Sequence, residues 1–338
     1  MKAIVFTQHG LPISDPAALF DTELEQPTPG PRDLLVEVQA ISVNPVDTKV
    51  RAGSGSTAQP KVLGWDAVGI VREVGSDVSL FQPGDEVFYA GAIDRPGSYS
   101  QFHLVDERIV GHKPRSLDAA SAAALPLTSI TAWELLFDRL GVAEGGGQGQ
   151  TLLIVGAGGG VGSILTQLAR KLTDLTVIGT ASRAETQQWV KDLGAHHVVD
   201  HSQPLPAQIA QIGDGQVDMV ISLTHTDRHF AQLIEVLRPQ GRLALIDDPA
   251  TLDVVPLKRK SLSLHWELMF TRSLYQTADM IKQHQLLDRV AALVDEGVLR
   301  TTLGEHFGAI NAQNLRRAHA LIESGKAKGK IVLARFDA

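Results

Sequence analysis

The sequence predicts an α/β protein in which a doubly wound parallel sheet lies between two segments of different character. Residues 1 to about 118 carry short apolar runs that Gly, Pro and Asp interrupt. After Asp118, short apolar runs alternate with amphipathic helical patterns, as in a parallel sheet covered by helices. From about residue 272, two further helical patterns and a closing strand follow. The length of 338 residues is sufficient for two domains.

The first segment is expected to form a small barrel or sandwich of antiparallel strands. Its clearest strand patterns are "LLVEVQAISV" (34–43) and "AVGIVREVG" (67–75), which are rich in Val and Ile and bounded by turn residues. The stretch "QPGDEVF" (82–88) has the pattern of a turn followed by a strand. Short strands separated by such turns are typical of these two architectures.

The middle segment contains apolar runs suited to parallel strands, which are buried on both faces and therefore read as continuous apolar sequence. These runs are "TLLIV" (151–155), "LTVIG" (175–179), "HVV" (197–199), "VDMVISL" (217–223) and "RLALI" (242–246). Between the first two, helical spacing on one face links Val161, Ile164, Leu165, Leu168 and Leu172.

The third segment predicts two helices and a strand. Apolar residues at helical spacing mark the helices: Leu287, Val290, Ala291 and Val294 in one, and Leu315, Ala318 and Ile322 in the other, with Gly325 as its stop. The run "GKIVLARF" (329–336) predicts the closing strand.

Composition excludes several classes of function. The net charge is 31 minus 38, or -7, which makes nucleic acid an unlikely partner because such binding needs clustered Lys and Arg. The chain has no cysteine, so disulfides, thiolate catalysis and cysteine-based zinc sites are excluded. The N-terminal apolar run is too short for a signal peptide, and residues 119–133 are too short for a bilayer that needs about 20 apolar residues. We expect a cytoplasmic protein with no membrane partner.

A glycine-rich turn is the strongest local motif. In "TLLIVGAGGGVGSILTQLARKL" (151–172) a strand ends, glycines follow and an amphipathic helix begins at once. A dinucleotide needs this context, because the backbone must approach its pyrophosphate and the helix N-terminus offers N–H groups. A tight turn that only packs helix against strand is the alternative interpretation. The predicted cofactor-binding residues are Ala157, Gly158, Gly159, Gly160, Val161 and Gly162.

The residues after the second strand of this unit favour NADP(H) over NAD(H). An NAD site places Asp or Glu about 20 residues beyond the turn, where it accepts from the ribose hydroxyls. This chain has "TASRAE" (180–185), with Ser182 and Arg183 at that place. The planar guanidinium of Arg183 suits a phosphate, although an arginine that opens a helix is also a common surface residue.

Over nearly its whole length the chain resembles the medium-chain dehydrogenase/reductase superfamily, and within it the quinone oxidoreductase branch and its zinc-type alcohol dehydrogenase-like proteins. The resemblance rests on a series of motifs in order: "SVNPVDTKVRAG" (42–53), "LGWDAVGIVREVG" (63–75), "PGDEVFYAG" (83–91), "LPLTSITAWELLFDRLG" (125–141), "GAGGGVGS" (156–163), "DLGAHHVVDH" (192–201) and "GKIVL" (329–333). It implies a Rossmann domain inserted in a GroES-like β-barrel catalytic domain. The implied limits are 1–123 and 272–338 for the catalytic domain and 124–271 for the NADP-binding domain.

The same resemblance bears on zinc. Zinc-dependent members of the superfamily carry Cys where this chain has Asn44, and Gly-His-Glu where it has Gly64, Trp65 and Asp66. Amide and indole are poor zinc ligands, so we expect no catalytic metal. His225 and His229 in "HTDRH" have a spacing that suits a metal on a helix, but a surface or cofactor-loop role is favoured.

Without a Lewis acid, reduction of a quinone or an α,β-unsaturated carbonyl by NADPH is the favoured chemistry. The resemblance makes Asn44, Asp47 and Lys49 candidate catalytic residues, with a turn, an ion pair and a surface lysine as the respective alternatives. Candidate pocket walls are Trp65, Tyr89 and Trp133, with core packing as the alternative for the latter two. Thr128 and Thr131 are candidate cofactor contacts, with helix capping or back-bonding as the alternative.

Two other functions remain open from the sequence: a zinc alcohol dehydrogenase acting on alcohols or aldehydes, and a non-catalytic, crystallin-like NADPH-binding protein. A homodimer is expected, because "RLALI" (242–246) and "SLSLHWELMF" (261–270) lie where family members pair sheet edges, and an exposed apolar strand needs a partner.

Overall fold

The computed structural model describes residues 1–337, which form two compact units. The discontinuous unit comprises residues 1–130 and the chain from Phe270 onward, and the inserted unit comprises residues 131–269. The limits predicted from the sequence fall at 123 instead of 130 and at 271 instead of 269. The first limit of the two units, between residues 130 and 131, lies within a single helix, Pro126–Trp133.

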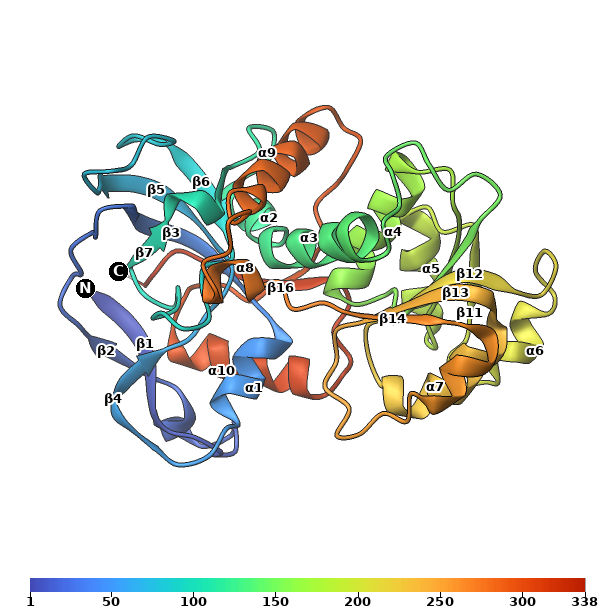
Figure 1. Ribbon diagram of the computed structural model, residues 1–338. Coiled ribbons are helices and arrows are strands. Elements are labelled where there is room, and N and C mark those ends of the chain that lie inside the picture. Colours follow the sequence, from blue (N-terminus) through green and yellow to red (C-terminus); the bar gives the residue numbers. More distant parts are fainter. Residues whose placement is uncertain (338) are drawn as a thin grey trace. The chain divides into compact units, whose positions relative to one another are not determined.

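The inserted unit is built on one six-stranded sheet in which every strand is parallel to its neighbours (Figure 1). The strand order β11-β10-β9-β12-β13-β14 is that of a doubly wound Rossmann sheet, so the predicted fold class is confirmed. The strands are β9 (Thr151–Val155), β10 (Thr176–Thr180), β11 (His197–Val199), β12 (Val217–Ser222), β13 (Leu237–Leu245) and β14 (Ser263–Trp266).

Helices cover both faces of this sheet. Figure 1 shows α4 and α5 on one face and α7 on the other, as the alternating pattern of strands and helices predicts. The helices of the unit are η3 (Glu134–Arg139), a π-helical segment, α4 (Gly160–Leu172), α5 (Ala184–Asp192), α6 (Leu205–Ile209), α7 (Thr226–Val236) and the 3₁₀ helix η4 (Val255–Lys260).

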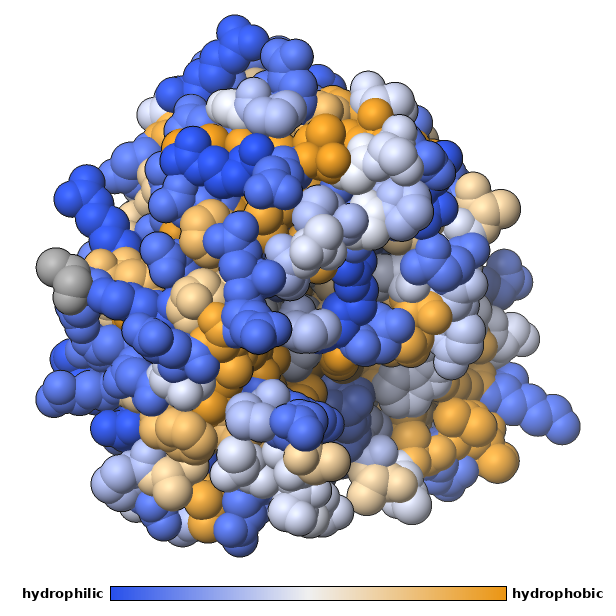
Figure 2. All heavy atoms as spheres, turned by 90° about the vertical axis from the view of Figure 1, so that its left-hand side faces the viewer, coloured by the Kyte–Doolittle hydropathy of each residue, from blue (hydrophilic) through white to orange (hydrophobic). Residues whose placement is uncertain are grey.

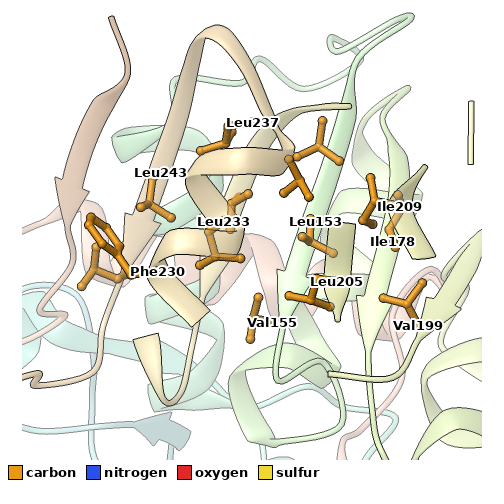
Figure 3. Close-up of a cluster of buried hydrophobic side chains, with 14 of the residues drawn as sticks. Leu153, Val155, Ile178, Val199, Leu205, Ile209, Phe230, Leu233, Leu237 and Leu243 are labelled. Atoms are coloured by element: carbon orange, nitrogen blue, oxygen red, sulfur yellow. The ribbon is translucent and has the colours of Figure 1, made fainter. Parts of the chain in front are cut away.

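One core cluster holds the sheet to α6 and α7 (Figure 3). Leu153 of β9, Leu205 of α6 and Leu233 of α7 are fully buried in it. Full burial of such a side chain contributes roughly 1.5–3 kcal/mol relative to exposure. The cluster therefore fixes the strands whose carboxyl ends carry the glycine-rich turn.

The discontinuous unit contains two sheets. A three-stranded antiparallel sheet has the order β2-β1-β4, with β1 (Lys2–Gln8), β2 (Phe20–Glu23) and β4 (Ser56–Val62). A seven-stranded sheet has the order β15-β16-β3-β5-β6-β8, and β7 also pairs with β3. Its strands are β3 (Asp33–Val43), β5 (Ala67–Val74), β6 (Glu86–Tyr89), β7 (Phe102–Asp106), β8 (Val110–His112), β15 (Leu303–His306) and β16 (Lys330–Ala334).

In that larger sheet β15 and β16 are parallel, and the remaining pairs are antiparallel, as predicted for the first segment. The predicted helices near residues 290 and 318 and the closing strand are confirmed as α9, α10 and β16. The helices here are η1 (Pro16–Ala18), α1 (Pro45–Arg51), η2 (Glu107–Ile109), α2 (Ala119–Ala123), α3 (Pro126–Trp133), α8 (Thr271–Leu274), α9 (Lys282–Asp295) and α10 (Ala312–Glu323).

One helical stretch, Ala119–Arg139, is long and apolar enough to resemble a membrane span, but 78% of its most apolar window is buried inside the structure. Burial of this kind is usual for a core helix. On the face shown in Figure 2, hydrophobic residues form separate groups among hydrophilic ones.

Candidate active site and cofactor-binding turn

The glycine-rich turn connects β9 to α4 and is tied to the neighbouring strand β10. The N–H of Gly156 donates to Thr180 Oγ1 at 3.0 Å, and the N–H of Ala157 donates to the Thr180 carbonyl at 3.1 Å. Gly162 is required for the close crossing of helix and turn, because a Cβ there would lie 2.5 Å from both Ala157 Cα and Gly156 O. The turn is therefore held in one conformation by both of its flanking elements.

The start of α4 presents backbone N–H groups that suit an anion. Gly159 is the N-cap, and its carbonyl accepts the N–H of Ser163 at 2.9 Å. The N–H groups of Gly160, Val161 and Gly162 precede that bond, so the helix itself provides no acceptor for them. A Cβ on Gly159 would meet only Gly156 O, at 3.6 Å, so the space beside these donors is open. These residues fit a dinucleotide pyrophosphate.

Ser182 and Arg183 lie just beyond the carboxyl end of β10, and both are exposed. Arg183 is the N-cap residue of α5, with an extended backbone. The positions between Thr180 and Ala184 carry no carboxylate, so the acceptor expected for an NAD ribose is missing from this loop.

In the discontinuous unit, Asn44, Asp66 and Lys330 form a buried polar cluster. The Asn44 amide uses both N–H groups, donating to the Trp65 carbonyl at 3.1 Å and to Asp66 Oδ2 at 2.8 Å. Lys330 Nζ donates to Asn44 Oδ1 and lies 3.0 Å from Asp66 Oδ2. The side chains of Lys330 and Asp66 are 3% and 0% exposed. Asn44 is thus fixed by its neighbours, with no amide hydrogen left for a substrate oxygen.

Asp66 receives further donors that complete this cluster. Ser42 Oγ donates to Asp66 Oδ2 at 2.7 Å, and the N–H of Leu127 donates to Asp66 Oδ1 at 2.8 Å. The positions at which zinc-dependent members of the superfamily carry ligands therefore hold an amide, an indole and a carboxylate neutralised by an ammonium group. This set of groups does not fit a zinc ion, because the lysine cation takes the carboxylate that a metal would need.

No group of three or more His, Asp or Glu side chains that could hold a metal ion occurs anywhere in residues 1–337. This includes the surroundings of His225 and His229, the pair with metal-like spacing.

Trp65 lines a cavity of about 490 Å³ within the discontinuous unit. Its side chain is nearly buried, its Nε1–H donates to the Ala92 carbonyl at 3.1 Å, and its ring centre lies 6.1 Å from that of Phe270. Leu63, Ile93 and Phe102 also line the cavity, which makes its wall largely apolar. Such a wall suits a flat hydrophobic ligand.

The other two predicted pocket residues occupy different surroundings. Tyr89 is fully buried, its ring is stacked on that of His103 with centres 5.5 Å apart, and its hydroxyl bonds His103 Nδ1 at 3.0 Å. His103, and not Tyr89, is among the residues that line the cavity beside Trp65. Burial lowers the pKa of His103 to about 4, so this imidazole is neutral. Trp133, in the inserted unit, is half-buried and contacts Phe137.

Asp47 is a buried carboxyl group at the start of α1. Its Oδ2 accepts from the Asn44 N–H at 2.7 Å and from the Tyr99 hydroxyl at 2.8 Å, while Oδ1 has no partner within residues 1–337. Burial raises the pKa of this carboxyl to about 7. The Tyr99 hydroxyl also bonds His319 Nε2 at 3.3 Å, and burial lowers the pKa of His319 to about 3.

Lys49 lies on the same helix as Asp47 and is exposed. Thr128 and Thr131 are both buried on α3. Thr128 Oγ1 donates to the Leu125 carbonyl at 3.2 Å, which is the back-bonding that the sequence left open as its alternative role.

Sequence reasoning missed Lys330, Tyr99 and His319 as members of these buried clusters. The sequence does hold an indication that Lys330 is paired, because it is a charged residue at the start of the buried strand β16. A lysine at such a position is rarely buried unless it is paired.

Two family models match the chain. One, an alcohol dehydrogenase GroES-like domain, matches residues 30–115, and the other, a zinc-binding dehydrogenase, matches residues 193–333. A zinc-type alcohol dehydrogenase-like protein of Staphylococcus aureus (strain MSSA476) is 40% identical over 92% of this chain and 93% of its own length. The human mitochondrial NAD(P)H oxidoreductase RTN4IP1 is 31% identical over 90% of this chain and 82% of its own length.

Solved structures share the fold over nearly the whole chain. A candidate zinc-dependent alcohol dehydrogenase from Rhizobium etli CFN 42 is 57% identical, with a TM-score of 0.96 over 100% of this chain and 99% of that one. The quinone oxidoreductase of Coxiella burnetii is 29% identical, with a TM-score of 0.80 over 99% of both chains. A mycobacterial protein solved with NADPH is 28% identical, with a TM-score of 0.84 over 99% of this chain and 100% of that one.

Proposed function

We propose that this chain reduces quinones or α,β-unsaturated carbonyl compounds with NADPH and without a metal ion. The chain belongs to the medium-chain dehydrogenase/reductase superfamily, as an oxidoreductase of the zinc-type alcohol dehydrogenase-like group. The buried cluster of Lys330, Asp66 and Asn44 carries the proposal. An alcohol dehydrogenase of the zinc type needs a Lewis acid to stabilise an alkoxide. Here the Lys330 ammonium group is paired with the Asp66 carboxylate. The amide of Asn44 and the indole of Trp65 are poor zinc ligands.

The inserted unit is proposed to bind the cofactor. The N–H groups at the start of α4 would bind the pyrophosphate, and Arg183 would bind the additional phosphate that distinguishes NADPH from NADH. NADPH, once bound, supplies the hydride. The mycobacterial relative with NADPH supports this choice of nucleotide.

The chain's own residues would orient the substrate rather than activate it through a metal. Trp65 gives the cavity of the discontinuous unit an aromatic wall against which a quinone or enone ring can lie. Reduction of such a conjugated system spreads the developing negative charge onto its oxygen, so fewer fixed donors are needed. The exposed Lys49 or a water molecule would then supply the proton. The Coxiella quinone oxidoreductase supports this substrate class.

The test is NADPH oxidation across a panel of quinones, enones and aldehydes, with and without a chelator. We expect turnover of quinones or enones that the chelator leaves unchanged. Activity restricted to aldehydes or alcohols and abolished by the chelator would instead establish the zinc dehydrogenase.

A matched variant keeps the fold and removes the proposed cofactor site. In Gly159→Asp, the new side chain has space and aspartate is a favourable N-cap, so the melting temperature should not fall. Its carboxylate would nevertheless occupy the N–H groups meant for the pyrophosphate. We expect this variant to lose NADPH oxidation, and unchanged activity in it would contradict the assignment of the turn.

A further inference from the structure

Three histidines gather at the carboxyl ends of the inserted unit's strands. His201 follows β11, while His225 and His229 lie at the N-cap and in the first turns of α7, after β12. The ring centres of His201 and His229 are 6.1 Å apart. In the sheet, β10 and β9 lie between β11 and β12. His201, which follows β11, therefore approaches His229 across the carboxyl ends of β10 and β9. The crevice at this point of a doubly wound sheet, where the strand order reverses, is where ligands bind.

Hydrogen bonds tie this histidine cluster to the glycine-rich turn. Thr180 Oγ1 accepts the Gly156 N–H at 3.0 Å and bonds His201 Nδ1 at 2.9 Å. The strand register also places His201 beside the nucleotide-selecting loop, because Thr180 pairs with Val199 and Ser182 is therefore level with His201. The imidazole thus lies next to the loop that carries Arg183.

His225 has a strained backbone. Its φ of 51° lies in the left-handed region, which residues other than glycine rarely adopt. Its Nδ1 bonds Thr224 Oγ1 at 2.7 Å, and a Cβ on Gly156 would be 3.0 Å from Thr224 Cγ2. Strain of this kind persists where surrounding structure imposes it, and it is enriched at ligand sites.

The three rings keep nitrogen atoms available for a ligand. Because Thr180 Oγ1 accepts from Gly156, its hydroxyl hydrogen can go to His201 Nδ1, which leaves the proton of the neutral ring on Nε2. Within residues 1–337, His201 Nε2, His225 Nε2 and both ring nitrogens of His229 have no hydrogen-bond partner. His201 and His229 are half-buried and His225 is exposed.

The charges around the cluster are mixed. Burial is the main cause that lowers the pKa of His201 and of His229, and the histidines repel one another's positive charge. The negative charge of Asp200 raises the pKa of His201. At His229, Asp227 raises the pKa and Arg228 lowers it. The Asp247 carboxylate accepts hydrogen bonds from the N–H and the hydroxyl of Thr226, the residue after His225, and keeps its negative charge.

We propose that His201, His225 and His229 form a proton-dependent phosphate subsite that strengthens the preference for NADP(H) over NAD(H) as the pH falls. The inference rests on the proposed function, because it assigns the added phosphate of the nucleotide to this crevice. A dianionic phosphate beside the rings favours their protonated form. By linkage, protonation then strengthens phosphate binding, whereas NAD(H), which lacks that phosphate, gains little.

The test measures dissociation constants of NADP⁺ and NAD⁺ by calorimetry between pH 8 and pH 6.5. This range stays above the second pKa of a phosphate, about 6, so the ligand keeps its charge. A rise of one unit in an imidazole pKa on binding corresponds to at most a tenfold change in affinity and to about threefold over this pH range. His201 and His229 together should therefore increase the NADP⁺/NAD⁺ affinity ratio about five- to tenfold.

Variants assign that change to the cluster. In His201→Gln/His229→Gln the ratio should vary less than about twofold with pH, while the melting temperature stays near that of the unaltered protein. The matched control His197→Gln, an exposed histidine on β11, should keep the full pH dependence. A pH-independent ratio in the unaltered protein, or the full dependence in the double variant, overturns the inference and leaves the proposed function intact. Absence of binding by both nucleotides overturns the proposed function itself.

Discussion

Replacing Lys330 by methionine removes the cation of the buried cluster and keeps most of the side-chain volume. Lys330 Nζ lies 3.0 Å from Asp66 Oδ2 and also donates to Asn44 Oδ1 and to the Val43 carbonyl. The variant Lys330→Met would leave the Asp66 carboxylate, which is 0% exposed, without its counter-charge. We therefore expect a large loss of stability from this single change.

The magnitude follows from the burial of both partners. Removing one partner of a buried ion pair costs about 3–5 kcal/mol. Ser42, Asn44 and Leu127 still donate to Asp66, which keeps the loss near the lower limit, about 3 kcal/mol. For a unit of this size, each kcal/mol lowers the melting temperature by about 2–4 °C, so a decrease of about 6–12 °C is expected.

Calorimetry on four proteins measures the effect: the unaltered chain, Lys330→Met, Asp66→Asn and the double variant. The double variant should recover at least half of the loss, because neither charge then remains buried without a partner. Lys61→Met, at an exposed lysine of the same unit, is the matched control and should change stability by less than about 0.5 kcal/mol. A melting temperature of Lys330→Met within 2 °C of the unaltered protein would refute this reasoning.

Three other predictions concern pH, cofactor choice and assembly. Because the pKa of Asp47 is about 7 in the fold against 3.8 in the unfolded chain, its ionisation destabilises the fold progressively as pH rises from about 4 to 7. The free energy of unfolding of Asp47→Asn, relative to that of the unaltered protein, should therefore increase by up to about 4 kcal/mol between pH 4 and pH 8 in thermal melts. A difference that does not change with pH would contradict the raised pKa of Asp47. Arg183→Ala should weaken NADPH binding about tenfold and spare NADH, whereas an equal loss for both would argue against a phosphate contact. The edge strand β14 leaves Trp266 51% exposed, so we propose a dimer through this edge. Light scattering should show a dimer that Trp266→Glu converts to a monomer, and a monomeric unaltered protein would contradict it.

The parallel sheet could be predicted from the sequence because its strands are covered on both faces. β9 is an apolar run after Thr151, and β12 is an apolar run that only Asp218 interrupts before Ser222; both were predicted within a residue of their ends. The start of β13 was missed, since it begins at Leu237 and continues through the polar residues 238–242 before the apolar run. Gln240 in that stretch has a φ of 64°, an irregularity that no period in the sequence reveals.

The local part of the site could be predicted from the sequence, whereas the contacts between residues far apart in the chain could not. The glycine-rich turn is one continuous segment, so its spacing alone predicts strand, turn and helix. The partners Asn44 and Lys330 are 286 positions apart, and Tyr99 and His319 are 220 apart. Their proximity depends on the pairing of β16 with β3 and on the placement of α10, which sequence periodicity does not determine.

We propose that NADPH-dependent reduction by this protein proceeds without a bound metal. The most direct measurement determines metal content by mass spectrometry and enone or quinone reduction on one and the same sample, after exhaustive dialysis against a chelator. We expect less than about one zinc per ten chains together with full turnover. Loss of turnover on dialysis, restored by one equivalent of zinc, would contradict it.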